Sequence, residues 1–187
     1  MSNEKVLASE IAVGETFVVG GIEWIKLPEK HGGFVAVAKE SLGDRAFDYN
    51  SNDFSKSSLL KYLEKEILPE IINEVGEDKV LDFETDLFSL DGHRKYGKMT
   101  SRISLPTFDF YRENHEIFNK HPLDDWWWLS TPNGEGGGVV VVAPLGFVDF
   151  INVDCIFGVR PVLLFSSSID EGYCQNSVPQ DSEGGAE

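Results

Sequence analysis

Short apolar runs with strand character dominate the first forty residues of the chain. Thr16–Val19 and Ile22–Leu27 flank a glycine pair at positions 20 and 21, and this pattern favours a two-residue hairpin. Phe34–Ala38 follows after a segment rich in turn residues. We therefore predict an antiparallel meander of three strands in this part of the chain.

A helical period replaces the strand pattern after Ser55. Apolar residues then recur at helical spacing, namely Leu59, Leu60, Leu63 and Ile67. Pro69 is compatible with this helix only where a new helical segment begins, and Gly76 is a suitable end for that second segment. The pattern thus predicts a helix that restarts near Pro69 and closes at Gly76.

The middle of the chain has weaker signals. Val80–Phe83 and Asp86–Leu90 are short strand candidates, and the next three residues, Asp-Gly-His, indicate a turn. The segment 95–106 has the composition of a loop, and 108–118 is a candidate for a short helix. The expected architecture is α+β, with antiparallel strands and one or two helices.

Strand signals return at Trp126 and continue to Phe165. Three apolar runs follow a glycine-rich turn, at Val139–Val142, Phe147–Val153 and Val159–Phe165. After Phe165 the composition changes to Ser, Gly, Gln and five acidic residues, without Lys or Arg. We expect one domain over residues 1–165 and an acidic disordered tail over residues 166–187.

The acidity of the chain restricts the kinds of molecule that it can bind. It carries 32 acidic and 16 basic residues, a formal net charge of −16, and no Lys/Arg cluster. Direct binding to nucleic acid or to an anionic membrane is therefore not expected, and the natural partners are cationic protein surfaces, metal ions or cationic ligands. The segment 40–91 alone holds 14 acidic and five basic residues. The same acidity also fits a purely solubilising role, and both interpretations stay open.

The sequence shows no pattern of a targeting signal, a disulfide framework or a zinc site. The N-terminus lacks the basic and apolar regions of a secretory signal, and the longest apolar run is too short to span a bilayer. Cys155 and Cys174 form neither a disulfide framework nor a zinc pattern, and Cys155 sits among apolar residues typical of a buried thiol. We expect a cytoplasmic protein, or one carried in a phage particle.

Motifs for catalysis are incomplete. His115-Glu116 begins a zinc-protease motif, but position 119 is Asn where the second histidine is needed. The glycines of 134–138 precede a run of valines, where a phosphate-binding loop would lead into a helix. The carboxylate pairs Asp124-Asp125 and Asp149/Asp154 match no calcium loop. We therefore expect no catalytic residues, no metal and no cofactor.

Three consecutive tryptophans, Trp126 to Trp128, mark the start of the second strand-rich half. On a strand, Trp127 faces one side, and Trp126 and Trp128 face the other. Burial in the core is one interpretation, because tryptophan favours core positions. A partly exposed indole used for binding is the other.

Several motifs together carry a family resemblance over roughly residues 15–165. Trp127-Trp128-Leu129-Ser130-Thr131-Pro132 resembles the WWLRSP signature of a bacterial and phage domain family of unknown function. Gly158-Val159-Arg160-Pro161-Val162-Leu163-Leu164 is similar to the closing GVRPALxL motif of that family. Segments 58–63 and 86–96 resemble its helix and strand motifs in the same order.

This resemblance implies a C-type-lectin-like fold, similar to that of formylglycine-generating enzymes and of the variable proteins of diversity-generating elements. Trp127, Trp128, Arg160 and Pro161 are then structural signature residues. The chain departs from the family at Ser130 and Lys61, where the family has arginines, so the salt bridges of those arginines do not carry over. The reactive cysteines of the enzymatic relatives have no counterpart either.

In such folds the ligand-facing positions lie between the tryptophan motif and the Gly-x-Arg strand, here residues 133–157. The glycine loop can adapt its backbone, and the following strand mixes aromatic and polar groups, as interfaces do. The candidate partner-binding residues are Asn133, Glu135, Phe147, Asp149, Phe150 and Asn152. An ordinary hairpin whose Phe residues fill the core is the alternative.

Two functions follow as hypotheses. The first is a non-catalytic module of a phage, a mobile element or its bacterial host that recognises a protein or another ligand. The second is an acidic inhibitor that imitates nucleic acid, in the manner of an anti-CRISPR or anti-nuclease protein, and fills a basic groove. An enzyme of unknown type is a weaker third alternative.

Overall fold

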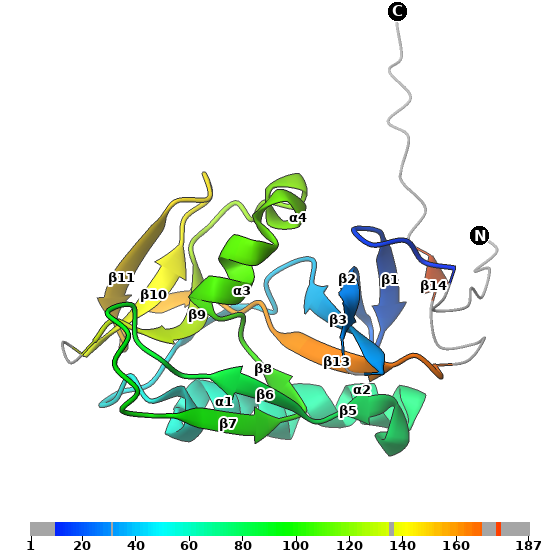
Figure 1. Ribbon diagram of the computed structural model, residues 1–187, viewed down its shortest axis with the longest axis horizontal. Helices are drawn as coiled ribbons and strands as arrows, with labels where there is room; N and C mark the ends of the chain where they lie inside the picture. Colours follow the sequence, from blue (N-terminus) through cyan, green and yellow to red (C-terminus); the bar gives the residue numbers. More distant parts are fainter. Residues whose placement is uncertain (1–9, 31, 135–136, 170–174, 177–187) are drawn as a thin grey trace, which may run out of the picture.

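The computed structural model describes residues 10–30, 32–134, 137–169 and 175–176, and it has an α+β architecture (Figure 1). The larger sheet has the strand order β14-β1-β2-β3-β13-β5, and β8 also pairs with β13. Its strands are β1 (Thr16–Val19), β2 (Ile22–Lys30), β3 (Gly33–Ala38), β5 (Val80–Leu81), β8 (Ile103–Ser104), β13 (Val162–Ser166) and β14 (Gln175–Asn176). The predicted α+β class and the three-strand meander β1-β2-β3 are confirmed.

The first hairpin depends on its glycine pair. Gly20 and Gly21 have φ of 63° and 68°, left-handed values that both central residues of a type I′ turn adopt. A Cβ on Gly20 would lie 2.9 Å from Cγ1 of Ile71 on the neighbouring helix. The turn therefore needs glycine both for its backbone and for the helix that packs behind it.

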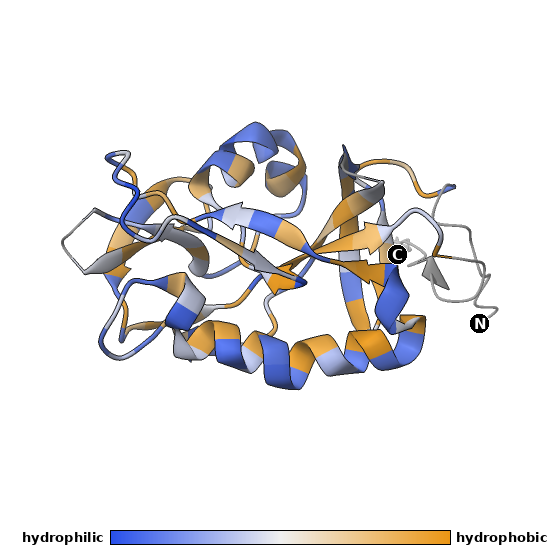
Figure 2. Ribbon diagram, turned by 60° about the horizontal axis from the view of Figure 1, so that its bottom comes forward, coloured by the Kyte–Doolittle hydropathy of each residue, from blue (hydrophilic) through white to orange (hydrophobic). Residues whose placement is uncertain are grey.

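A long helical layer runs beneath both sheets in Figure 1. It comprises a 3₁₀ turn (Phe54–Lys56), α1 (Ser58–Tyr62), a π-helical turn (Leu63–Ile67), α2 (Leu68–Val75) and a second 3₁₀ turn (Glu77–Lys79). The Ser57 side chain accepts a hydrogen bond from the backbone N–H of Leu60, which caps the start of α1. Figure 2 shows hydrophobic and hydrophilic residues alternating along the helix, as the spacing predicts.

Pro69 explains the π-helical turn. Proline has no N–H for the ladder and its ring crowds the preceding turn. The chain responds by widening the helix, so that the N–H of Leu68 bonds to the carbonyl of Leu63 five residues earlier. Gly76, with φ of 94°, then ends α2. The predicted restart near the proline and the predicted stop at Gly76 are both confirmed.

The smaller sheet has the strand order β11-β10-β9-β12-β4. Its strands are β4 (Asp44–Ala46), β9 (Trp127–Pro132), β10 (Gly138–Val142), β11 (Val148–Asn152) and β12 (Ile156–Gly158). Strand β12 runs parallel to β9, where Gly158 pairs with Trp127. A Cβ on Gly158 would lie 2.9 Å from Ser41 Oγ and 3.1 Å from the Trp126 carbonyl, which explains the glycine of the closing motif.

The middle of the chain contradicts two predictions. Asp86–Leu90 is not a strand, because β6 (Phe83–Asp86) ends where that strand was expected to begin. The expected loop over 95–106 contains β7 (Lys98–Ser101) and β8. Strands β6 and β7 form a two-stranded ribbon of mostly polar residues, in which Lys98 bridges to Glu84 at 2.6 Å and to Asp86 at 3.1 Å. The ribbon is stabilised by ion pairs between its two strands and not by an alternating apolar pattern, so the composition of the segment does not reveal it.

Two short helices, α3 (Phe108–Glu113) and α4 (His115–Lys120), take the place of the single predicted helix. They lie over the smaller sheet and close a second core, which includes Tyr111, Phe118, Trp127 and Val142. The larger core lies between the sheets and the long helix and contains Phe17, Trp24, Phe165 and Trp128 among others. Strand β9 therefore contributes side chains to both cores.

The predicted tail is partly ordered where it is described. Strand β13 extends through Ser166, Ile169 is 2% exposed, and Gln175–Asn176 pairs with Phe17 and Val18 of β1. The domain thus continues beyond Phe165, because an apolar residue and a strand segment return inside the polar composition. Residues 170–174 and 177–187 of the predicted tail lie outside the described residues.

Within the described ranges, no helix is both long enough and apolar enough to cross a membrane.

Candidate functional site

Strand β11 forms one edge of the smaller sheet (Figure 1). Large apolar side chains are exposed along it and directly before it. Phe147 and Phe150 are each 53% exposed, and Val148 is 37% exposed. Asp149 and Asn152 are exposed beside them. We call Phe147, Val148, Asp149, Phe150 and Asn152 the β11 surface. The alternative in which these phenylalanines fill the core does not hold, since more than half of each side chain is exposed.

The β11 surface has two faces, because successive side chains of a strand alternate. Phe147 lies on the side of Trp126, with their rings edge to face at 5.4 Å. Val148, Phe150 and Asn152 point to the opposite side, the side of the second core. The structure therefore brings the predicted residues together along one strand, but divides them between the two sides of the sheet.

The backbone of this edge strand is partly blocked. Asp149 pairs with Val141 of β10, and Phe150 is the next residue along the strand. The backbone N–H of Phe150 donates a 2.8 Å hydrogen bond to the Asp149 carboxylate. An edge N–H that is already bonded cannot pair with another strand, and a charged residue on an edge guards against strand addition. The β11 surface thus offers side chains more readily than backbone groups.

The glycine loop lies beside the other end of β11, where Gly138 pairs with Asn152. Its described ends are held by Asn52, which is 4% exposed and donates from Nδ2 to the carbonyls of Gly138 at 3.1 Å and Gly134 at 3.3 Å. The Tyr96 hydroxyl donates to Asn52 Oδ1 at 2.6 Å. These three bonds anchor the loop that the sequence analysis predicted to be adaptable.

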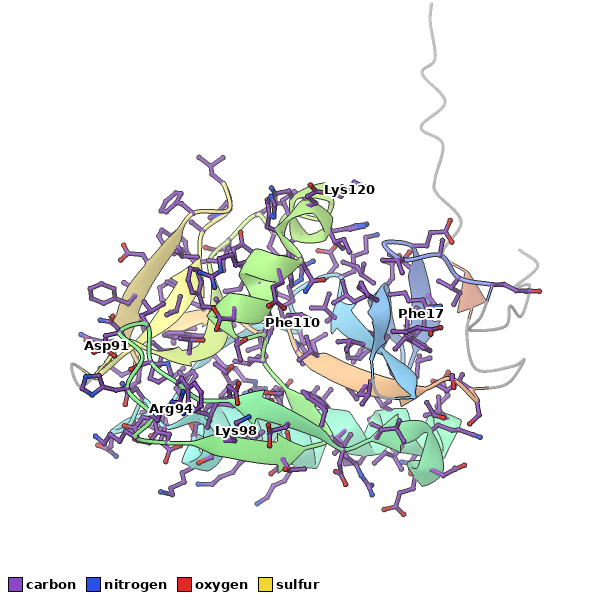
Figure 3. All side chains as sticks on the ribbon, viewed as in Figure 1. Phe17, Asp91, Arg94, Lys98, Phe110 and Lys120 are labelled. Atoms are coloured by element: carbon purple, nitrogen blue, oxygen red, sulfur yellow. The ribbon has the colours of Figure 1, made fainter. Side chains whose placement is uncertain are left out.

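Two further residues at the start of the glycine loop, Asn133 and Gly134, are held in place by the surrounding structure. Asn133 is half-buried, and its backbone N–H donates to the Gly138 carbonyl at 2.9 Å. Gly134 has φ of 58°, and a Cβ there would lie 2.6 Å from Asp91 Oδ2. Figure 3 shows Asp91 at this end of the molecule. Glu135, also predicted for the site, lies outside the described residues.

The tryptophan motif is mainly structural. Trp127 is 2% exposed and Trp128 is fully buried, and they face different cores. The Trp128 indole donates to the Arg45 carbonyl at 2.8 Å. Trp126 is half-buried and contacts Phe147 and Phe157. Its indole therefore supports the β11 surface from behind.

Arg160 and Pro161 connect β12 to β13 and are both buried. The Arg160 guanidinium donates from Nε to the Ala38 carbonyl at 2.7 Å and from Nη2 to the His121 carbonyl at 3.0 Å. Burial lowers the pKa of Arg160 to about 10, and the charge of Glu40 opposes that shift. The guanidinium thus links the end of β3 to the backbone after α4.

Sequence reasoning missed a pocket of about 250 Å³ between α4 and the turn that joins β10 to β11. Its walls include Tyr111, Phe118, Trp127, Leu145 and Arg160. Burial raises the pKa of the Tyr111 hydroxyl, and the positive charge of Arg160 acts against this rise. These residues come from separate segments, so no local pattern could have found the pocket. The one feature of the sequence that pointed to this region was an apolar residue, Leu145, between the turn-forming Pro144 and Gly146; the structure shows that it is exposed.

Exposed carboxylates of the acidic segment 40–91 are partly paired. Arg102 bonds to Glu77 at 2.8 Å, and Lys98 bonds to two carboxylates of β6 (Figure 3 labels Lys98). Among the residues that the structure describes, no three His, Cys, Asp or Glu side chains group as metal ligands would.

Comparisons with protein-family models, with curated proteins and with solved structures found no match for this chain.

Proposed function

We propose that this protein is a non-catalytic recognition module that binds a basic protein partner through the β11 surface. The observation that carries the proposal is the exposure of Phe150 on the edge strand β11 and of Phe147 directly before it, each at 53%. Large apolar side chains are costly to leave in water, and their clustering beside polar groups is typical of interfaces. Trp126, packed against Phe147, holds one of these rings in place.

Charge supports a basic partner. Residues 121–159, which contain β9 to β12, include five acidic residues and neither Lys nor Arg. A partner with an apolar centre and a rim of Lys or Arg would complement both features of this region. The bond between the Phe150 N–H and Asp149 favours recognition by side chains over the addition of a strand.

A C-type-lectin-like fold for the domain is part of this proposal. The two motifs that carry the resemblance lie on neighbouring strands, since β9 holds the tryptophans and β12 leads into Arg160. The segment between them contains the β11 surface, as the resemblance implies for ligand-facing positions. An origin in a phage, a mobile element or its host follows from the same resemblance.

Acidic mimicry of nucleic acid is the competing proposal. The exposed helix carboxylates Glu64, Glu66 and Glu70 favour it, because they stand on a rigid element. The competing proposal is weakened by the ion pairs of Glu77 with Arg102 and of Glu84 and Asp86 with Lys98. A mimic of the phosphate backbone needs carboxylates whose charge is not already neutralised by the protein itself. We therefore rank it second.

Affinity capture with two matched variants separates the proposals. One variant carries Val148→Ser and Phe150→Ser, and the other carries Glu64→Lys and Glu70→Lys. Loss of the same captured protein with the first variant alone supports the β11 surface. Loss with the second variant alone, together with release by about 0.5 M salt, would support mimicry and reject our proposal.

A further inference from the structure

The pocket beside α4 is a cavity that the proposed function does not use. It measures about 250 Å³ and lies between α4 and the turn from β10 to β11. One side of it is closed by Tyr111, whose hydroxyl donates to the Gly146 carbonyl at 2.8 Å. An apolar cavity of about 150 Å³ accommodates a benzene ring, so this pocket has room for a ring and a small substituent.

Aromatic side chains form its inner wall. The rings of Phe118 and Trp127 stack with centroids 5.5 Å apart, and those of Tyr111 and Trp127 meet edge to face at 5.8 Å. These contacts fix the orientation of the rings, because all three residues are more than nine-tenths buried. Such a rigid wall favours a flat apolar ligand over a flexible one.

A buried positive charge lines the same pocket. Arg160 is 1% exposed, and its guanidinium carbon lies 5.1 Å from the Phe118 ring centre and 5.3 Å from that of Trp127. Its two hydrogen bonds go to carbonyl oxygens, which leaves three of the five guanidinium N–H groups unused. Within the described ranges no carboxylate lies at ion-pair distance from Arg160, although the charge of Glu40 acts on it from farther away.

The charge of Glu40 compensates the buried Arg160 charge only in part, because the effect of burial is the larger of the two. Carbonyl dipoles and ring faces satisfy part of a guanidinium, but a buried charge without an opposite charge beside it is costly. Arginine N–H groups bind carboxylates with charge-assisted bonds that are roughly twice as strong as neutral ones. We infer that the pocket binds a small aromatic carboxylate, with its ring against Phe118 and Trp127 and its anionic group on Arg160. This pocket adjoins the β11 surface at Gly146, but no residue of the β11 surface lines it, so its failure would leave the proposed function untouched.

The test uses pairs of probes that differ only in charge. Phenylacetate and indole-3-acetate are titrated into the labelled full chain and followed by amide chemical shifts, beside phenylacetamide and indole-3-acetamide. We expect the carboxylates to bind at least about tenfold more tightly than the amides, with shifts at the amides of Leu145 and Gly146. Equal affinity for acids and amides, or no binding at millimolar concentration, would overturn the inference.

Variants at the rim avoid the risk of unfolding the core. Leu145 is 89% exposed and lines the pocket, so its replacement leaves the fold intact. Leu145→Lys should tighten carboxylate binding about twofold and Leu145→Glu should weaken it about twofold, without any effect on the amides. Leu90→Glu is the control and should change neither affinity, because Leu90 is an exposed residue outside the pocket whose N–H donates to the Pro132 carbonyl at the far end of β9. Equal carboxylate affinities for the two Leu145 variants would count against the site.

Arg160→Met removes the guanidinium and should abolish the preference for the acid. Circular dichroism and the amide spectrum establish whether that variant is folded, and the Leu145 pair decides the question if it is not.

Discussion

Replacing Asn52 tests whether one buried amide holds the loop next to the β11 surface. The side chain makes three hydrogen bonds, to Gly138 O, Gly134 O and the Tyr96 hydroxyl, at 3.1, 3.3 and 2.6 Å. Each such bond contributes about 0.5–1.5 kcal/mol. The Gly138 carbonyl keeps a second bond from Asn133, and Gly134 can reach water. We therefore expect Asn52→Ala to lower the free energy of unfolding by about 2–3 kcal/mol.

Asn52→Asp sharpens the test because it keeps the shape of the side chain. At neutral pH it places a carboxylate oxygen opposite the two glycine carbonyls, so it should destabilise more than Asn52→Ala. These oxygens also raise the pKa of the new carboxyl in the folded state. A raised pKa on an acid means that the folded form binds the proton more tightly, so this variant should regain stability as the pH falls below about 5.

Urea denaturation at pH 7 and pH 4.5 measures both variants, with Asn50→Ala as the control. Asn50 is exposed, and its side chain makes no hydrogen bond that the structure describes. The control should stay within about 0.5 kcal/mol of the unaltered chain. If Asn52→Ala also stays within that range, or if Asn52→Asp shows no pH dependence relative to it, the amide does not anchor the loop.

Three further perturbations check the packing. Trp128→Ala should lower the free energy of unfolding by about 3–5 kcal/mol, measured by urea denaturation, and Trp126→Ala should lower it clearly less, because Trp128 is fully buried and Trp126 is not. Equal losses for the two variants would contradict the two-core arrangement. Gly158→Ala should lower the unfolding free energy by about 1–3 kcal/mol, since its Cβ would clash with Ser41, and a neutral effect would refute that account. Burial raises the pKa of Asp48, but the backbone hydrogen bonds that its carboxylate accepts, the one from Ser58 first, outweigh burial, and the pKa falls below 3.8. The folded chain therefore loses stability as this carboxylate is protonated below pH 3.8, and Asp48→Asn should lose less stability over that range. Parallel acid-unfolding curves for the variant and the unaltered chain would reject this account.

Elements with strong local signals could be predicted from the sequence. The hairpin at Gly20-Gly21 is specified by two adjacent residues that tolerate positive φ. The helix restart at Pro69 follows from the missing N–H of proline, although the π-helical turn that accommodates it does not. Strand alternation placed Trp127 and Trp128 on opposite faces, but it left open whether both are buried; both are, because β9 lies between two cores.

Features that depend on distant partners could not be predicted. Strand β7 exists because Lys98 meets Glu84 and Asp86 across a ribbon, and its own composition resembles a loop. Ile169 packs on the domain from a segment whose average composition indicates disorder.

The candidate site shows the same division between local and distant signals. The mixed aromatic and polar pattern of Phe147–Asn152 was compatible with an interface strand and with a core-filling hairpin, and only the structure shows that Phe147 and Phe150 are exposed. The pocket beside α4 needs Tyr111, Trp127 and Arg160, which only the fold brings together. Likewise, Asn52 reaches the glycine loop from 82 positions away along the chain.

The most direct test of the recognition proposal is hydrogen exchange of the chain alone and in complex with its captured partner. Our account predicts that exchange slows in peptides covering residues 145–157, and that peptides covering α1 and α2, residues 58–75, are unchanged. Protection of the helix peptides without any change over 145–157 would contradict the β11 surface and would place the partner on the acidic helix.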